Sequence, residues 1–360
     1  MAANENVLTQ EEGSQMKAVV FEEHGGIEVL NYMDVPEPKI SPNEVLIRIK
    51  ASGCNYNDIW ARRGLPGMSV VMPHISGSDA AGEVVEVGSE VTNVKVGDEI
   101  VVHSSLSCGM CEACSRGDVF FCRQFKIWGF QTGPLDGGHA EYAKLPAFNA
   151  VPKPKNLTWE QAASLPLVLF TAWRMLVTRA RVKPGDFVLV WGGAGGLGTM
   201  AVQICKLHGA KAIAVANSDD KLEIARQLGA AYVINRSKQD VADEVKKITE
   251  RRGVDIVFEH TGEATWETSV RSLKWGGTIV VCGATTGFEA KTDLRLLWNK
   301  QLNFLGSHMG NKAELLEALR FVESGDIKPV VSLALPLQEA GLAQQAMEDG
   351  NVIGKLVLTR

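Results

Sequence analysis

The spacing of hydrophobic residues along this chain changes near residue 184. From residue 17 to residue 102, short apolar runs alternate with Gly, Pro and Asp; the runs are KAVVF, EVLIRIKA, AGEVVEVG and GDEIVV. Short strands with turn residues between them predict a compact β-barrel or sandwich. Residues 1–15 offer few apolar side chains to bury, so we expect a disordered tail there, with regular structure starting at Met16.

After residue 184, longer helical stretches separate the apolar runs. The six runs are 187–191, 211–216, 231–235, 254–260, 278–283 and 302–306, and the helical stretches include 221–228, 241–249 and 266–273. Strands that alternate with helices predict an α/β fold with a doubly wound parallel sheet. Its two βαβαβ halves would bind a dinucleotide where the strand order reverses.

The last segment, 307–360, contains a predicted helix over 312–324 and two short β runs, PVVSLALPL and GKLVLTR. It is too small to fold alone, so we expect it to return to the first domain. A length of 360 residues also favours two domains, at a prior of about 150 residues each. We therefore predict one domain from 16–150 and 307–360, and a dinucleotide-binding domain from 151–306.

Charge narrows the classes of function. The chain has 37 Lys and Arg against 42 Asp and Glu, a net charge of −5. This balance argues against a nucleic-acid partner or a membrane surface, which require clustered basic charge. No apolar run approaches the roughly 18 residues of a membrane span, and the polar N-terminus has no signal-peptide core. We expect a cytoplasmic protein.

A glycine-rich motif follows the first strand of the predicted parallel sheet. In VWGGAGGLG, the spacing G-x-G-x-x-G is met by Gly193, Gly195 and Gly198, with Gly196 and Leu197 between them. Gly193 would allow the tight turn, Gly195 the approach of a pyrophosphate, and Gly198 the packing of helix on strand. A glycine-rich turn without a ligand is the alternative, but the strand before the motif and the helix after it favour a dinucleotide loop.

The residue at the end of the second strand selects between NAD and NADP. An NAD enzyme places an acid there, whereas this chain has Ala216. The side chains able to bind a 2′-phosphate nearby are Ser218, Lys221 and Arg236. Asp219 and Asp220 weaken this argument, yet the pattern as a whole favours NADPH.

Four of the seven cysteines lie within fifteen residues, in the spacing C-x2-C-x2-C-x7-C formed by Cys108, Cys111, Cys114 and Cys122. In a cytoplasmic chain such a cluster indicates a metal rather than disulfides. Four thiolates close a tetrahedral zinc shell, which is structural. An iron–sulfur site and a site that has lost its metal are the alternatives.

Taken together, these motifs resemble the medium-chain dehydrogenase/reductase superfamily over residues 17–360. The resemblance implies a GroES-like β-barrel catalytic domain with a structural zinc lobe, beside a Rossmann sheet. Alcohol dehydrogenases of this family also hold a catalytic zinc through a Cys-His-Thr-Asp stretch, a Gly-His-Glu stretch and a later Cys. Here the first ligand position is Asn55, the second stretch reads Gly-Ser-Asp at 77–79, and 164–173 has no Cys. We therefore expect no catalytic zinc, and hydride addition to a substrate that is already electrophilic.

Within the family, the chain is most similar to the crotonyl-CoA carboxylase/reductase branch of enoyl-thioester reductases. The motifs are NYNDIW at 55–60, IWGFQT at 127–132, CGATTGF at 282–288, and D-x-R-x-L-W with G-S-H-M-x-N over 293–311. This branch implies NADPH, a CoA thioester substrate and a homodimer or homotetramer.

Carboxylating members form a carbon dioxide pocket from an Asn, a Phe-Glu pair and a His, which by motif are Asn57, Phe130, Gln131 and His308. Gln131 replaces the acid, so plain reduction is favoured over carboxylation. We expect Asn55 and Asn57 to donate to the thioester or enolate oxygen and His308 to deliver a proton. Phe130 would cover the nicotinamide or the acyl chain, and Arg295 would contact a CoA phosphate.

Each of these residues also has a structural alternative: a turn for the two asparagines, a satisfied histidine for His308, the core for Phe130 and a surface ion pair for Arg295. The sequence thus predicts NADPH-dependent reduction of a short-chain 2-enoyl-CoA, such as acryloyl-CoA or crotonyl-CoA. Three alternatives remain open: a zinc-free NADPH quinone or alkenal oxidoreductase, a reductive carboxylase, and a non-catalytic NADPH-binding protein.

Overall fold

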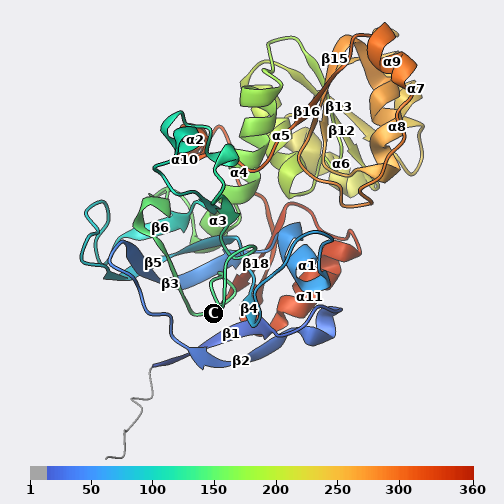
Figure 1. Ribbon diagram of the computed structural model, residues 1–360. Coiled ribbons are helices and arrows are strands. Elements are labelled where there is room, and N and C mark those ends of the chain that lie inside the picture. The colour runs from blue at the N-terminus through green and yellow to red at the C-terminus, as the bar shows by residue number, and fades with distance from the viewer. Residues whose placement is uncertain (1–13) are drawn as a thin grey trace, which may run out of the picture.

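The computed structural model describes residues 14–360, whose two largest β-sheets lie in opposite halves of the molecule with a helical region between them (Figure 1). The predicted tail over residues 1–15 lies almost wholly outside the described residues. Where the description begins, strand β1 (Gln15–Phe21) starts at Gln15, one residue before the predicted start at Met16.

The second half of the chain forms a six-stranded parallel sheet in the order β13-β12-β11-β14-β15-β16. Its strands are β11 (Phe187–Val190), β12 (Lys211–Ala216), β13 (Tyr232–Asn235), β14 (Val254–Glu259), β15 (Leu273–Val281) and β16 (Asn303–Gly306). In chain order this is 3-2-1-4-5-6, the doubly wound arrangement. The Rossmann prediction is confirmed, and the reversal of strand order lies between β11 and β14.

Helices α5 (Gly196–Leu207), α6 (Asp219–Gln227), α7 (Val241–Ile248) and α8 (Glu263–Ser272) connect these strands, and α9 (Leu294–Asn299) precedes β16. Two predicted boundaries are wrong. The helix expected over 266–273 starts at Glu263, and the strand expected over 278–283 starts at Leu273. The strand is longer because Leu273 still pairs with Val254 of β14 before a register shift.

The first half forms a seven-stranded sheet with the path β10-β6-β5-β3-β18-β17, while β9 also pairs with β3. Its strands are β3 (Glu44–Gly53), β5 (Asp79–Val87), β6 (Glu99–Val102), β9 (Tyr142–Pro146), β10 (Ala150–Pro152), β17 (Val331–Pro336) and β18 (Lys355–Thr359). A smaller sheet contains β1, β2 (Asn31–Pro36) and β4 (His74–Ile75), and β7 (Ser105–Leu106) pairs with β8 (Lys126–Ile127). The GroES-like prediction for this half is confirmed.

The C-terminal strand closes the first sheet. β18 pairs antiparallel with β3, from Val357 opposite Gly53 to Thr359 opposite Ala51. The remaining helices of this half are α1 (Tyr56–Arg63), α2 (Glu112–Ser115), α3 (Trp159–Ala163), α10 (Lys312–Glu323) and α11 (Ala340–Glu348), of which α3 and α11 pack against this sheet. The last residues of the chain thus reach the strand that leads into the NYNDIW motif.

Helix α4 (Pro166–Trp173) joins the two halves. All of its residues are buried, it starts with a proline at its first position, and it packs against α5 and α10. The largest cluster of buried apolar residues includes Ala81 of β5, Phe170 of α4 and Val188 of β11. Among the described residues, no helix is long and apolar enough to span a bilayer.

Candidate functional site

A cavity of about 620 Å³ opens between the two halves. Its walls come from α1 and the loop before it, the loop after β8, α4, the glycine-rich turn after β11, the segment around residue 308 and the start of β18. The volume lies within the range of roughly 300–1,000 Å³ typical of ligand pockets. Because residues that follow β11 and β14 line it, the cavity lies at the reversal of strand order, where a doubly wound sheet is expected to bind its ligand.

The glycine-rich turn divides its roles between packing and lining the cavity. A Cβ on Gly198 would lie 2.0 Å from the Gly192 carbonyl oxygen, and a Cβ on Gly193 would lie 2.6 Å from the Ala214 Cβ. These two glycines permit close approach, whereas the tight turn predicted for Gly193 has its positive φ, +56°, at the preceding Gly192. Gly195, Gly196 and Leu197 line the cavity.

Gly195 precedes the first residue of α5, so the first N–H groups of this helix lie at the cavity wall. Such groups have no partner within their own helix and favour an anion. The turn therefore fits the pyrophosphate of a dinucleotide.

Two cations lie where the cavity passes the end of β12. Lys221 and Arg236 both line it, and burial together with the charge of Arg236 lowers the pKa of Lys221. Asp219 binds elsewhere, since its carboxylate accepts from Lys238 Nζ at 2.6 Å and Asn235 Nδ2 at 2.6 Å. Paired cations of this kind fit a phosphate group. Ser218 precedes α6 but is not among the residues that line the cavity.

Five residues predicted for the acyl site line the same cavity: Asn55, Asn57, Phe130, Gln131 and His308. They come from three segments far apart in the chain. Asn57 Nδ2 is buried and has no hydrogen-bond partner. Gln131 is held by its own loop, because its Oε1 accepts from the backbone N–H of Ile127 at 3.1 Å. Asn57 thus offers an unused donor at this wall of the cavity.

His308 packs against the ring of Phe125, with the two ring centroids 5.3 Å apart. Burial, assisted by the positive charge of Arg174, lowers the pKa of His308 below its ordinary value of 6.5. The imidazole is therefore neutral at pH 7, and each of its nitrogens is restricted to a single role as donor or acceptor.

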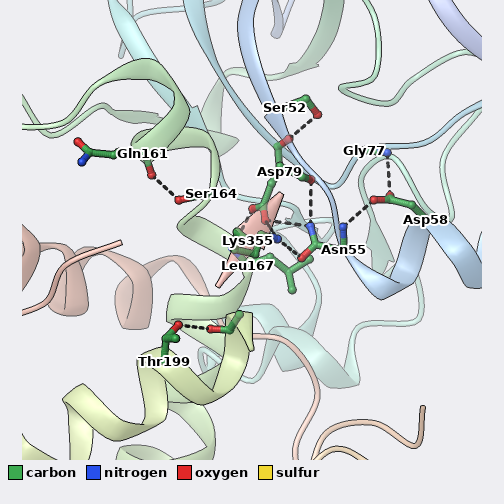
Figure 2. Close-up of polar contacts among 12 residues, drawn as sticks. Ser52, Asn55, Asp58, Gly77, Asp79, Gln161, Ser164, Leu167, Thr199 and Lys355 are labelled. Carbon is green, nitrogen blue, oxygen red and sulfur yellow. Dashed lines mark hydrogen bonds and ion pairs between the residues drawn. The ribbon is translucent and has the colours of Figure 1, made fainter. Parts of the chain in front are cut away.

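The expected role of Asn55 as a donor to substrate does not agree with its contacts. Its Nδ2 donates to Asp79 Oδ2 at 2.9 Å and to the Gly53 carbonyl at 3.3 Å, and its Oδ1 accepts from Lys355 Nζ at 2.6 Å (Figure 2). Asn55 is 6% exposed and immediately precedes α1. Both N–H groups of its amide are engaged, so Asn55 organises the site rather than donating to a ligand.

Asn55, Ser78 and Asp79 hold the positions at which alcohol dehydrogenases of this family carry zinc ligands. Lys355 Nζ lies 2.6 Å from Asn55 Oδ1 and 3.2 Å from Asp79 Oδ2. An ammonium group stands among these side chains, and Asn55 and Ser78 are poor zinc ligands. This donor set does not fit a divalent metal ion.

The cysteine cluster, in contrast, fits a divalent metal ion. All four Sγ atoms of Cys108, Cys111, Cys114 and Cys122 lie within 4.8 Å of one another, and among residues 14–360 no other His, Cys, Asp and Glu group gathers in this way. Zinc–sulfur bonds of about 2.3 Å in a tetrahedron imply similar separations. Backbone N–H groups of Met110 and Cys111 lower the pKa of the Cys108 thiol to about 6, which favours the thiolate. With zinc bound, the four thiolates would fix this loop.

We expect the protein to purify with about one zinc ion per chain, and the Cys114→Ser variant to lose it, because three thiolates leave the shell open. Metal content by mass spectrometry checks this result. Cys205→Ala is the matched control, since Cys205 is buried in α5, away from the cluster. Equal zinc content in wild type and Cys114→Ser would contradict the assignment.

Arg295 does not line the cavity. It lies on α9 with its side chain 75% exposed, and its Nη2 donates to Asp293 at 2.8 Å. The surface ion pair described as the alternative is therefore what the structure shows. A contact with a CoA phosphate remains a prediction.

Sequence reasoning missed Lys355. The signal was a single charge at the head of an otherwise apolar strand, since Leu356, Val357 and Leu358 are all buried. Its partners lie 276 and 300 residues away in the chain. A local pattern could flag the lysine but could not name them.

The fold combines a GroES-like sheet with a Rossmann sheet around one cavity, an arrangement typical of oxidoreductases, and the comparisons agree. Residues 41–155 match the alcohol dehydrogenase GroES-like domain, and residues 196–324 match the zinc-binding dehydrogenase family. The chain belongs to the medium-chain dehydrogenase/reductase superfamily of oxidoreductases. The predicted family is confirmed.

Among its relatives, a crotonyl-CoA carboxylase/reductase from Cereibacter sphaeroides is 37% identical, over 92% of this chain and 83% of the relative. A solved NAD-dependent alcohol dehydrogenase has a TM-score of 0.92 and 41% identity, covering 96% of this chain and all of that one. A 2-octenoyl-CoA carboxylase reductase, solved with NADP and 2-octenoyl-CoA, has a TM-score of 0.86 and 34% identity, covering 96% and 87%. The chain is thus similar to both enoyl-CoA reductases and alcohol dehydrogenases.

Proposed function

We propose that this protein reduces a short-chain 2-enoyl-CoA, such as acryloyl-CoA or crotonyl-CoA, to the saturated acyl-CoA with NADPH and without a catalytic metal. The observation that carries the proposal is the gathering of Asn57, Phe130, Gln131 and His308 in one cavity with the glycine-rich turn. The crotonyl-CoA carboxylase/reductase relative supports the substrate class.

The residues at the zinc positions argue against alcohol oxidation, the rival activity. Alcohol oxidation in this family uses a metal ion to polarise the alcohol oxygen. Here the ligand positions hold Asn55, Ser78 and Asp79, and the last of these pairs with Lys355. A conjugated thioester needs no such metal, because its β-carbon already accepts a hydride.

NADPH is supported by the charges beside β12. Ala216 stands where an NAD enzyme has an acid, and both Lys221 and Arg236 face the cavity. A 2′-phosphate would relieve the repulsion between these two cations. The NADP in the structure of the 2-octenoyl-CoA relative agrees with this choice.

In the proposed reaction, bound NADPH supplies a hydride to the β-carbon, which leaves a thioester enolate. Asn57 Nδ2, buried without a partner, donates to the developing negative charge on the thioester oxygen. His308 relays the proton that the α-carbon takes up: being neutral, it donates from one ring nitrogen while the other accepts a proton from solvent. Phe130 is 5% exposed and limits the length of the acyl group beside it.

Reduction without carboxylation is supported by Gln131. In carboxylating relatives of this branch the equivalent position is an acid, and the amide removes its negative charge. The Oε1 of Gln131 also accepts a hydrogen bond from the backbone N–H of Ile127. We therefore assign plain reduction to this protein.

Anaerobic turnover of NADPH with acryloyl-CoA and crotonyl-CoA, set against simple quinones and 2-alkenals, tests the proposal. We expect the enoyl thioesters to react faster, NADPH to be preferred over NADH, and the product mass to be that of the saturated acyl-CoA with or without bicarbonate. Faster reduction of quinones or alkenals would favour the quinone reductase alternative. NADPH binding with no hydride transfer would indicate a non-catalytic protein.

The exposed edge of strand β16 is relevant to how copies of this chain associate. This strand is the last of the parallel sheet, and its outer side has no strand beside it among residues 14–360. Edge strands tend to pair. A homodimer through this edge, or a dimer of such dimers, is therefore part of the proposal.

A further inference from the structure

Lys355 brings a charge into the core of the first domain. It opens β18 with its side chain 7% exposed, and the three residues after it are buried. Burying an ammonium group is costly unless it is paired and hydrogen-bonded. The position of this charge therefore depends on the partners that hold it.

Its counter-ion, Asp79, is held from three sides (Figure 2). Asp79 is fully buried, and its Oδ1 accepts from the backbone N–H of Leu167 at 2.8 Å. Its Oδ2 accepts from Asn55 Nδ2 at 2.9 Å and from Lys355 Nζ at 3.2 Å. The carboxylate is thereby fixed by β5, α4 and the start of α1, and it fixes the ammonium in turn.

The glycine-rich turn also leaves room for the Lys355 side chain. Gly354 N donates to the Ala194 carbonyl at 2.7 Å, which ties the start of β18 to the glycine-rich turn. A Cβ on Gly196 would lie 2.9 Å from Lys355 Cδ, so the glycine leaves room for the lysine. The side chain runs from the turn to the positions where alcohol dehydrogenases of the family hold zinc ligands.

One N–H of the ammonium remains for a ligand. An ammonium group has three donors, and Asn55 Oδ1 and Asp79 Oδ2 take two of them. Lys355 lines the cavity together with Asn57, whose amide Nδ2 has no hydrogen-bond partner.

We infer that Lys355 does the electrostatic work of a catalytic metal by donating to the thioester oxygen as hydride reaches the β-carbon. The inference rests on the proposed enoyl-thioester reduction. Negative charge develops on that oxygen during the transfer, and a fixed cation in a largely buried site stabilises it strongly. Lys355 exchanges no atom with the substrate. Asp79 and Asn55 are positioning residues, which hold the ammonium in place before the substrate arrives.

A role confined to cofactor binding makes a different prediction. Lys355 passes Gly196 at the start of α5, so an ammonium that only held the pyrophosphate would affect the Kd of NADPH and not the hydride-transfer step. The two roles can be separated by measuring both quantities.

The test is stopped-flow single turnover of saturating NADPH with crotonyl-CoA, alongside fluorescence titration of NADPH. For Lys355→Met we expect hydride transfer to slow about 100-fold, as when an oxyanion donor is removed, with the Kd of NADPH changed less than about threefold. Lys355→Arg keeps the charge and should recover part of the rate. A rate within threefold of wild type, or a loss found only in the Kd, would overturn the inference.

Lys355→Met leaves Asp79 buried and unpaired, so a second variant is needed. Asp79→Asn combined with Lys355→Met removes both charges and should fold, yet remain as slow as the single variant. Recovery of the wild-type rate in the double variant would show that the unpaired carboxylate caused the loss, and would overturn the inference. Lys221→Met is the contrasting variant, expected to raise the Kd of NADPH.

The wild-type enzyme separates the two proposals. If it reduces no enoyl thioester, the proposed function fails and this inference fails with it. If it reduces crotonyl-CoA and Lys355→Met does so equally fast, only the role of Lys355 is refuted.

Discussion

The Gly198→Val variant is expected to bind NADPH at least about 100-fold more weakly than wild type and to lose about 3 kcal/mol of folding free energy. A Cβ at this position would lie 2.0 Å from the Gly192 carbonyl oxygen, a backbone atom that no rotamer change can move. Either the turn or the start of α5 must shift. The shift would displace the N–H groups at the cavity wall that fit the pyrophosphate.

Fluorescence titration with NADPH and urea unfolding measure the two effects. Gly306→Ala, at the end of β16 in the same sheet, is the control, because a Cβ there meets no atom within 4 Å. Gly306→Ala should keep both wild-type values. If Gly198→Val bound NADPH with wild-type affinity, the assignment of this turn as the cofactor loop would be wrong.

The protein is also expected to lose stability steeply as the pH falls from about 6.5 to about 4. Burial lowers the pKa of His74 to about 4 and that of His103 to about 4, from an ordinary value of 6.5. Between these limits the unfolded chain binds two protons that His74 and His103 exclude when folded, and His260 and His308, whose pKa values burial also lowers, add to this uptake. The free energy of unfolding therefore falls as the pH drops, by up to about 2.7 kcal/mol per pH unit where both groups contribute.

A further buried histidine, His139, contributes little to the pH dependence of the free energy of unfolding. Burial lowers the pKa of His139 to about 3 and raises that of Asp58 to about 7, and the two side chains lie 3.8 Å apart. Folded, the pair keeps one proton on Asp58; unfolded, it keeps one on His139. Proton uptake on unfolding is thus nearly balanced for this pair between pH 4 and 6.5.

Urea unfolding at a series of pH values measures the slope. The His103→Gln variant should reduce the slope by up to about 1.4 kcal/mol per pH unit, the contribution of one group. Glutamine does not titrate but can still donate to the Gly310 carbonyl, as His103 Nε2 does at 3.1 Å. An unchanged slope in this variant would show that His103 is not among the groups that take up protons. A flat profile for wild type would contradict the prediction for both histidines.

Features carried by neighbouring residues could be predicted from the sequence. The alternation of strands and helices after residue 184 predicted a doubly wound parallel sheet, because each βαβ unit is local in the chain. The spacing of the four cysteines and of Gly193, Gly195 and Gly198 was also informative, because each set forms within one loop. Element boundaries were less secure: the start of β15 depended on pairing with β14, which no local pattern records.

The roles of individual residues also differed in how far the sequence could predict them. Asn57, Phe130, Gln131 and His308 could be selected by motif, and the cavity that they share agrees with their selection. Asn55 was selected too, but its amide is already bound to Asp79 and Lys355. A sequence shows that an asparagine can donate; only its neighbours show whether a donor is left.

The sequence by itself determined the family and the spacing of the four cysteines, and it predicted the cofactor loop and the absence of catalytic zinc ligands. The tertiary structure alone decided which side chain lies beside Asn55 and Asp79. Antiparallel pairing of β18 with β3 carries Lys355 across 300 residues of chain to Asn55, and the packing of α4 supplies the backbone N–H that fixes Asp79. The physical reason is that a charge in an apolar strand is tolerated only with a partner, and partners distant in sequence meet only through the packing of the whole fold.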